Sequence, residues 1–105
     1  MTEKLTNAVV KAAIEALQKG NGKAWGDLFV PNAIFYDDGN RRDLKVFSKS
    51  IIGHEQFTSI DVVENDGLDV YGHFHSDQWG DFETYFKFEV NQQGKISKLE
   101  IGQVD

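Results

Sequence analysis

The clearest pattern in the chain is a strict alternation of apolar and polar positions between Phe82 and Val90. Apolar residues occupy nearly every second position, and charged residues such as Glu83 and Lys87 stand between them. Alternation with a period of two is typical of a long β-strand that buries one face. A turn signal ending at Gly94 and a second extended segment follow. This region therefore predicts a β-hairpin.

The whole second half of the chain is β-like. Strands are expected at residues 57–64, 68–75, 79–90 and 96–104. Asn65-Asp66-Gly67 and Gln92-Gln93-Gly94 have the composition of hairpin turns. One earlier strand is expected at 33–37, closed by the turn residues Asp38-Gly39-Asn40.

The first half of the chain has helical spacing. Apolar residues three and four apart predict a helix over 6–19, which ends at Gly20-Asn21-Gly22. A second helix is expected at 23–30, stopped by Pro31, and a third from about residue 44 to Gly53. The order of helix, helix, strand, helix and four strands predicts an α+β fold with an antiparallel meander, in a single domain spanning 1–105.

Composition narrows the classes of partner. A net charge of −6 argues against nucleic acid and anionic membranes, because neither would be attracted to the chain. There is no cysteine for a disulfide or a thiolate, and no apolar run resembling a signal peptide or a membrane span. The chain also lacks a Gly-rich phosphate loop and a Gly-x-Ser-x-Gly elbow. We therefore expect a cytoplasmic protein without a cofactor.

Two segments carry a family resemblance. ALQKGNGKAWGDLFVPNAIFYDDG and YFKFEVNQQGKISKLEIGQ resemble the opening and closing segments of NTF2-like proteins, which include SnoaL-like polyketide cyclases and ketosteroid isomerases. The resemblance implies an NTF2-like (cystatin-like) cone, with N-terminal helices packed on a curved, mainly antiparallel sheet. It also implies a homodimer formed through the outer sheet face, and a ligand-binding pocket between the concave face and the helices.

Asp37 is the first candidate for chemistry. Alternation places it on the same face as Phe35, where loss of solvation would raise the pKa of the carboxyl toward that of a useful base. The resemblance matches it to the general base of ketosteroid isomerases. The two oxyanion donors of those enzymes fall at Ala13 and Thr84, so steroid isomerisation is not expected. The alternative is that Asp37 is a turn residue bonded to local backbone amides.

Ligand contacts are expected on the concave face of the sheet. The resemblance and the alternation together select seven side chains: Phe35, Val70, Phe74, Thr84, Phe86, Leu99 and Ile101. Aromatic residues of this kind can equally fill a core.

Three other features leave alternatives open. His73 and His75 share one strand face and could bind a metal with an aspartate, but an ordinary polar role on the outer sheet face is favoured, and no metal site is predicted. Trp79 suits either the mouth of the cone or a subunit interface. Arg41 and Arg42 could face an acidic ligand, although pairing with neighbouring aspartates is favoured.

Two functions are consistent with these features. One is a SnoaL-like protein that binds a small apolar or weakly polar organic molecule, and that acts as a lyase, isomerase or cyclase if Asp37 serves as a base. The other is a non-catalytic homodimeric module whose cone is filled by its own side chains. A cavity of ~300 Å³ or more beside Asp37 would favour the first.

Overall fold

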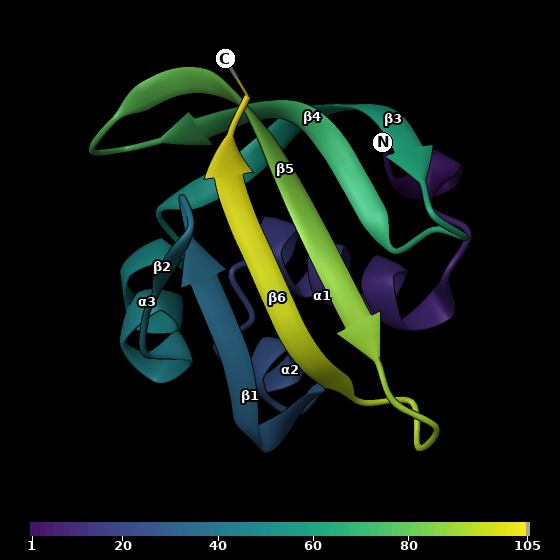
Figure 1. Ribbon diagram of the computed structural model, residues 1–105. Coiled ribbons are helices and arrows are strands. Elements are labelled where there is room, and N and C mark those ends of the chain that lie inside the picture. The colour runs from purple at the N-terminus through teal and green to yellow at the C-terminus, as the bar shows by residue number, and fades with distance from the viewer. Residues whose placement is uncertain (105) are drawn as a thin grey trace.

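The computed structural model describes residues 1–104 as a curved, six-stranded sheet with helices on its concave face (Figure 1). This confirms the predicted α+β class. The helical elements are η1 (Thr2–Lys4), α1 (Ala8–Lys19), α2 (Gly22–Gly26) and α3 (Leu44–Ile51). The strands are β1 (Phe29–Asp37), β2 (Asn40–Arg41), β3 (Glu55–Glu64), β4 (Asp69–Ser76), β5 (Gly80–Val90) and β6 (Ile96–Gln103).

The sheet has the strand order β2-β1-β6-β5-β4-β3. Strands β3 to β6 form the predicted antiparallel meander. In contrast, β1 runs parallel to β6, with Phe35 opposite Leu99 and Asp37 opposite Ile101. The sequence pattern did not predict this parallel pairing. The pairing places Asp37 beside the C-terminal end of β6.

Helix α1 ends at Lys19 as predicted but begins at Ala8, two residues later than expected. The Asn7 side chain accepts hydrogen bonds from the amides of Val9 and Val10, which satisfies two free donors of the first turn. Gly20 closes the helix in the left-handed conformation, with φ of 68°. The helix buries its apolar face against the sheet, through Val10, Ala13, Ile14, Ala16 and Leu17.

The expected second helix, 23–30, is wrong in its second half. Helix α2 ends at Gly26, and the chain enters β1 at Phe29, which pairs with Ile96 of β6. Sheet pairing therefore overrides the local helical pattern. Pro31, which has no amide hydrogen, lies in the irregular stretch of β1 between Phe29 and Ile34 rather than at a helix end.

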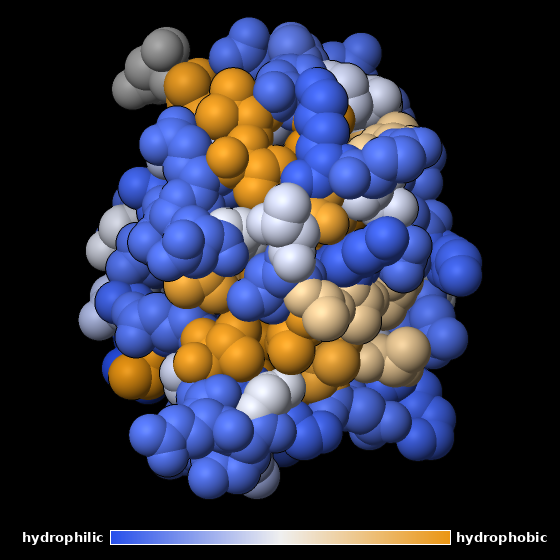
Figure 2. All heavy atoms as spheres, turned by 90° about the vertical axis from the view of Figure 1, so that its right-hand side faces the viewer, coloured by the Kyte–Doolittle hydropathy of each residue, from blue (hydrophilic) through white to orange (hydrophobic). Residues whose placement is uncertain are grey.

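The core fills the narrow part of the cone with aromatic rings. Phe57 lies 5.0 Å, centroid to centroid, from both Phe74 and Phe86, and Phe86 lies 6.2 Å from Phe88. Hydrophilic residues cover much of the side seen in Figure 2, with separate hydrophobic areas between them. In the described part of the chain, no helix has the length and apolar character needed to cross a bilayer.

Candidate functional site

A cavity of about 530 Å³ opens at the wide end of the cone. Helix α3, the start of β3, the β4–β5 turn and the C-terminal ends of β1 and β6 surround it. Apolar walls come from Phe47, Ile51, Phe74, Phe82, Phe86 and Ile101. Polar groups come from Asp37, Asp38, Ser50, Glu55, Gln78, Asp81, Thr84 and Gln103. A cleft of this volume, with apolar walls and convergent polar groups, is in the range usual for small-molecule sites.

Asp37 lines this cavity from the last position of β1. Its carboxylate accepts no hydrogen bond from residues 1–104, whereas a turn residue would bond local amides. Burial raises the pKa of the Asp37 carboxyl, the charge of Asp38 raises it further, and Arg42 opposes the shift. A partly desolvated carboxylate without a partner suits proton abstraction better than a structural role.

Asp38 has a structural role instead. Its side chain accepts a hydrogen bond of 3.0 Å from the Gln103 amide, and its own amide donates to the Ile101 carbonyl at 2.9 Å. The residue adopts a left-handed backbone with φ of 50°, which aspartate tolerates better than most residues. These bonds join the end of β1 to β6 and thereby fix the position of the neighbouring Asp37.

Glu55 is a second cavity carboxylate that the sequence analysis missed. It begins β3 opposite Ser76, and the Ser76 hydroxyl donates a 2.8 Å hydrogen bond to it. Burial raises the pKa of the Glu55 carboxyl and the charge of Asp37 adds to the rise, while the bond from Ser76 opposes it. Alternation from Phe57 would have placed Glu55 on the concave face, but the strand was expected to begin only at 57.

Ser76 connects this carboxylate to the mouth of the cavity. The side chain is 1% exposed, and its oxygen accepts hydrogen bonds from the amides of Gln78 at 3.2 Å and Trp79 at 3.1 Å. Trp79 itself lines the mouth and remains 72% exposed. One hydroxyl therefore orients Glu55 and also holds the turn that carries Trp79.

Thr84 lines the cavity, but its hydroxyl proton is already used. The side chain is 1% exposed and donates a 2.7 Å hydrogen bond to the Gly102 carbonyl. A hydroxyl has a single proton to donate. Thr84 therefore cannot stabilise a developing oxyanion in this arrangement. At the other donor position of the ketosteroid isomerases, Ala13 is fully buried in the core.

The structure brings together five of the eight residues predicted for the site: Asp37, Phe74, Thr84, Phe86 and Ile101. The other three, Phe35, Val70 and Leu99, are fully buried and do not line the cavity. Strand register explains the difference for two of them. Asp37, Ile101 and Phe86 form one row across the sheet, and Phe35, Leu99 and Phe88 form the next row toward the narrow end.

Val70 shares the row of Phe86 but lies beyond the edge of the cavity. The buried Phe57 ring of β3 packs against that of Phe86, with 5.0 Å between the ring centroids. Phe35 is covered in a similar way by Phe47, whose ring centroid is 4.3 Å away. Aromatic contacts of Phe47 from α3 and Phe57 from β3 therefore fill the interior next to the cavity.

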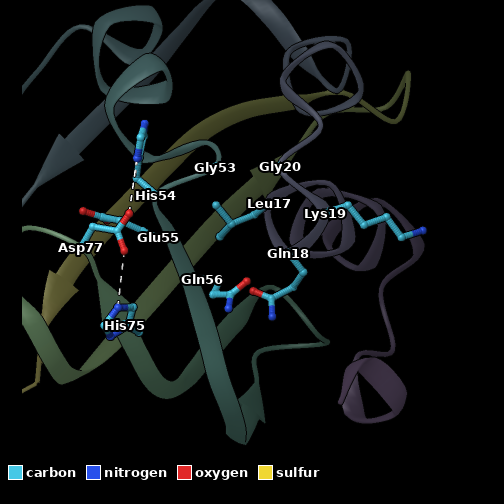
Figure 3. Close-up of a pocket in the computed structure, with 10 residues that line it drawn as sticks. All are labelled: Leu17, Gln18, Lys19, Gly20, Gly53, His54, Glu55, Gln56, His75 and Asp77. Carbon is cyan, nitrogen blue, oxygen red and sulfur yellow. Dashed lines mark hydrogen bonds and ion pairs between the residues drawn. The ribbon is translucent and has the colours of Figure 1, made fainter.

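A smaller pocket of about 260 Å³ lies on the other side of Glu55, between α1 and the start of β3. His54 and His75 stand on opposite sides of Asp77 there, at 3.4 Å and 3.5 Å from its two carboxylate oxygens (Figure 3). His75 also contacts Asp81 at 2.6 Å, and this hydrogen bond raises the pKa of the imidazole. All four side chains are largely exposed to solvent.

His73 lies on the outer face of the sheet, as expected from the alternation. It forms contacts of 2.8 Å with Asp61 and 3.3 Å with Glu83. Within residues 1–104, no group of three or more His, Asp or Glu side chains is arranged to hold a metal ion. The predicted pairing of Arg41 and Arg42 with neighbouring aspartates is wrong: neither arginine has a carboxylate within 4.0 Å in the described residues.

The sequence matches no protein-family model and no curated protein. The fold does match solved structures. A protein from Cytophaga hutchinsonii, described as NTF2-like and of unknown function, superposes with a TM-score of 0.73 at 16% identity, over 96% of this chain and 92% of that one. The chain has the NTF2-like fold.

Other structural neighbours with the same degree of similarity carry different descriptions. A protein of Sinorhizobium meliloti, provisionally called a polyketide cyclase, has a TM-score of 0.74 at 18% identity, over 96% of this chain and 98% of that one. The Orange Carotenoid Protein of Anabaena, solved with canthaxanthin, has a TM-score of 0.74 at 17% identity. The match covers 97% of this NTF2-like chain but only 37% of the carotenoid protein.

Proposed function

We propose that the protein binds a small, neutral and largely apolar organic molecule in the cone cavity. The volume of about 530 Å³ exceeds what a side-chain-filled cone would leave. Four carboxylates line the cavity, which disfavours anionic ligands: Asp37, Asp38, Glu55 and Asp81. The canthaxanthin bound by the Anabaena neighbour is an apolar molecule, which supports this ligand class without identifying the ligand.

Within that cavity, Asp37 acts as a general base that removes a proton from the bound molecule. The observation that carries this role is an aspartate on the cavity wall that has no hydrogen-bond donor in residues 1–104 and a pKa raised by burial. Glu55 is the second group that can exchange a proton with the bound molecule, because burial raises the pKa of its carboxyl and the charge of Asp37 adds to the rise against the hydrogen bond from Ser76; a proton that Glu55 donates is replaced by the one that Asp37 has taken up. Proton abstraction of this kind underlies isomerase, cyclase and lyase reactions.

The base can be tested without knowing the natural substrate. 5-Nitrobenzisoxazole is a neutral aromatic probe whose C–H proton is removed by a carboxylate while its N–O bond breaks to release a coloured phenolate. Asp37→Asn should reduce its turnover by about 100-fold or more, a usual contribution of a general base. Asp81→Asn is the matched control, since Asp81 also lines the cavity but its side chain is 84% exposed and paired with His75.

Stability separates a base from a structural carboxylate. Because burial raises the pKa of Asp37, the ionised carboxylate makes the folded state less stable at neutral pH. Asp37→Asn should therefore leave the free energy of unfolding unchanged or increase it. If Asp37→Asn turns over the probe like the wild type, or loses much stability, Asp37 is not the base.

The alternative, a non-catalytic dimeric module, is less well supported because the cone is open at Asp37. Dimerisation itself stays a prediction. The outer face of the sheet suits it, since the Tyr71 and Tyr85 rings lie 6.4 Å apart there and Lys87 lies 5.2 Å from the Tyr85 ring. The cytoplasmic location also stays a prediction.

A further inference from the structure

A second concave site, here called the basic groove, lies across α3 from the cone cavity. Phe47 and Ile51 of α3 line the cone cavity, whereas Leu44 and Ser48 line the groove. The groove has a volume of about 670 Å³ and is enclosed by α2, the first part of β1, β2 and α3. The two sites therefore share one helix as a wall, but no lining residue belongs to both.

The floor of the groove is aromatic and firmly held. Trp25 is 1% exposed, and its indole Nε1–H donates a 2.9 Å hydrogen bond to the Ser48 hydroxyl of α3. The Phe29 ring lies 5.0 Å from that of Trp25, centroid to centroid. Pro31 and Leu44 add further apolar surface. Trp25 is buried beneath this floor, so the surface offered to an apolar ligand comes from Phe29, Pro31 and Leu44, and the hydrogen bond from Trp25 to Ser48 ties α2 to α3 below it.

The rim of the groove is positively charged in a chain whose net charge is −6. Four of its eleven Lys and Arg residues line it: Arg41, Arg42, Lys45 and Lys49. None of the four has a carboxylate within 4.0 Å in residues 1–104. Asp43 is the one acidic residue of the lining, and its side chain is engaged in capping α3 through the Val46 amide at 3.0 Å.

We propose that the basic groove binds a small organic anion of the aryl- or alkyl-carboxylate class. The apolar body of the ligand packs on Phe29, Pro31 and Leu44 above the buried Trp25, and its carboxylate lies among the cations of the rim. Unpaired cations close together repel one another, so an anion that neutralises them is attracted to this place. Guanidinium and ammonium groups supply the donors that a carboxylate accepts.

Shape and charge favour a small molecule over a macromolecule. The groove volume falls in the range of about 300–1,000 Å³ that is usual for small-molecule sites. A nucleic acid or an anionic membrane would meet the negative charge of the remaining surface as it approached. A compact anion can reach the four cations without that contact.

The ligand class is tested with a pair of probes that differ only in charge, 1-naphthoate and 1-naphthalenemethanol. Their dissociation constants are measured by NMR titration of the wild type and of two double variants. Lys45→Gln/Lys49→Gln should weaken naphthoate binding about fivefold, as expected for two exposed charge contacts. Lys11→Gln/Lys19→Gln removes the same charge from α1 and should leave binding unchanged. The neutral alcohol should bind more weakly than naphthoate to the wild type, and equally to all three proteins.

The two tryptophans report which cavity is occupied, because Trp25 lines the basic groove and Trp79 lines the cone cavity. Naphthoate should shift the indole N–H resonance of Trp25 and leave that of Trp79 in place. A shift confined to Trp79 would overturn the proposal, and so would equal binding of the acid and the alcohol. Equal affinities of the wild type and Lys45→Gln/Lys49→Gln would overturn it as well.

Discussion

Ser76→Ala is the sharpest single test of how the cone cavity is built. The substitution removes one donated bond of 2.8 Å to Glu55 and two accepted bonds, of 3.2 Å and 3.1 Å, from backbone amides. The residue is 1% exposed, so water does not readily replace the hydroxyl. A bond to a charged group contributes about 1.5–3 kcal/mol and a neutral one about 1, but Glu55 is only half-buried and the amides lie near solvent.

We therefore expect Ser76→Ala to lower the free energy of unfolding by about 2 kcal/mol. Unfolding entropy of about 2 cal/mol/K per residue converts this to a fall in Tm of roughly 9 °C for a chain of this length. Thermal unfolding followed by circular dichroism measures it. Ser97→Ala is the control, because Ser97 donates only a 3.3 Å surface bond to the Glu89 carbonyl, and it should change stability by less than about 0.5 kcal/mol.

The same substitution should alter the titration of Glu55. The bond from Ser76 lowers the pKa of this carboxyl against the effect of burial, so losing it should raise the pKa further. Carboxyl-carbon NMR measures that pKa directly. In the Glu55→Gln background, Ser76→Ala should destabilise the protein less, since no charged bond is lost. An unchanged Tm together with an unchanged Glu55 titration would refute the role given to Ser76.

Three further predictions follow from other contacts. Thr84→Val should lower stability by about 1–2 kcal/mol, measured by urea unfolding, because the buried 2.7 Å bond to β6 is lost without a change in volume; an unaffected stability would show that the hydroxyl is free for a ligand. Gly72→Ala should destabilise the fold by about 3 kcal/mol or prevent folding, because the added methyl would collide with the Ser59 carbonyl of the neighbouring strand; a wild-type Tm would contradict this packing. The pKa of His75 is raised above 6.5, mainly by the hydrogen bond with Asp81, so the contribution of this ion pair to stability should be complete below pH 6.5 and disappear as the pH rises through the raised pKa. The difference in Tm between His75→Gln and the wild type should follow the same course. A difference that does not change with pH would count against the His75–Asp81 pair.

Local sequence patterns predicted much of the fold. Strand patterns and turn signals located β3 to β6 to within two residues at either end, and apolar spacing with the stop at Gly20 located α1 to within two residues. The pairing of β1 with β6 had no such signal, because parallel strands that are far apart in sequence share no turn. The predicted length of helix α2 was too great for the same reason. Phe29 pairs with Ile96 of β6, and this pairing cannot be seen from the residues around Phe29 alone.

The sequence likewise predicted some features of the candidate site and not others. Asp37 was found because its position after Phe35 fixes the face on which it lies. Glu55 was missed because the strand was expected to begin at residue 57, two residues after the position at which β3 begins. For Thr84, sequence gave the location but not the hydrogen bond that occupies its proton, since the acceptor lies on another strand.

The parallel pairing of β1 with β6 also bears on how the molecule folds. The four strands of the meander contact their chain neighbours and can assemble through short loops. The β1–β6 ladder joins residues about 65 positions apart, and the entropy of closing so long a loop must be overcome before the ladder forms. We expect the meander to form early and the ladder late in folding. The wide end of the cone, with Asp37 at its edge, would then be the last part of the molecule to take shape.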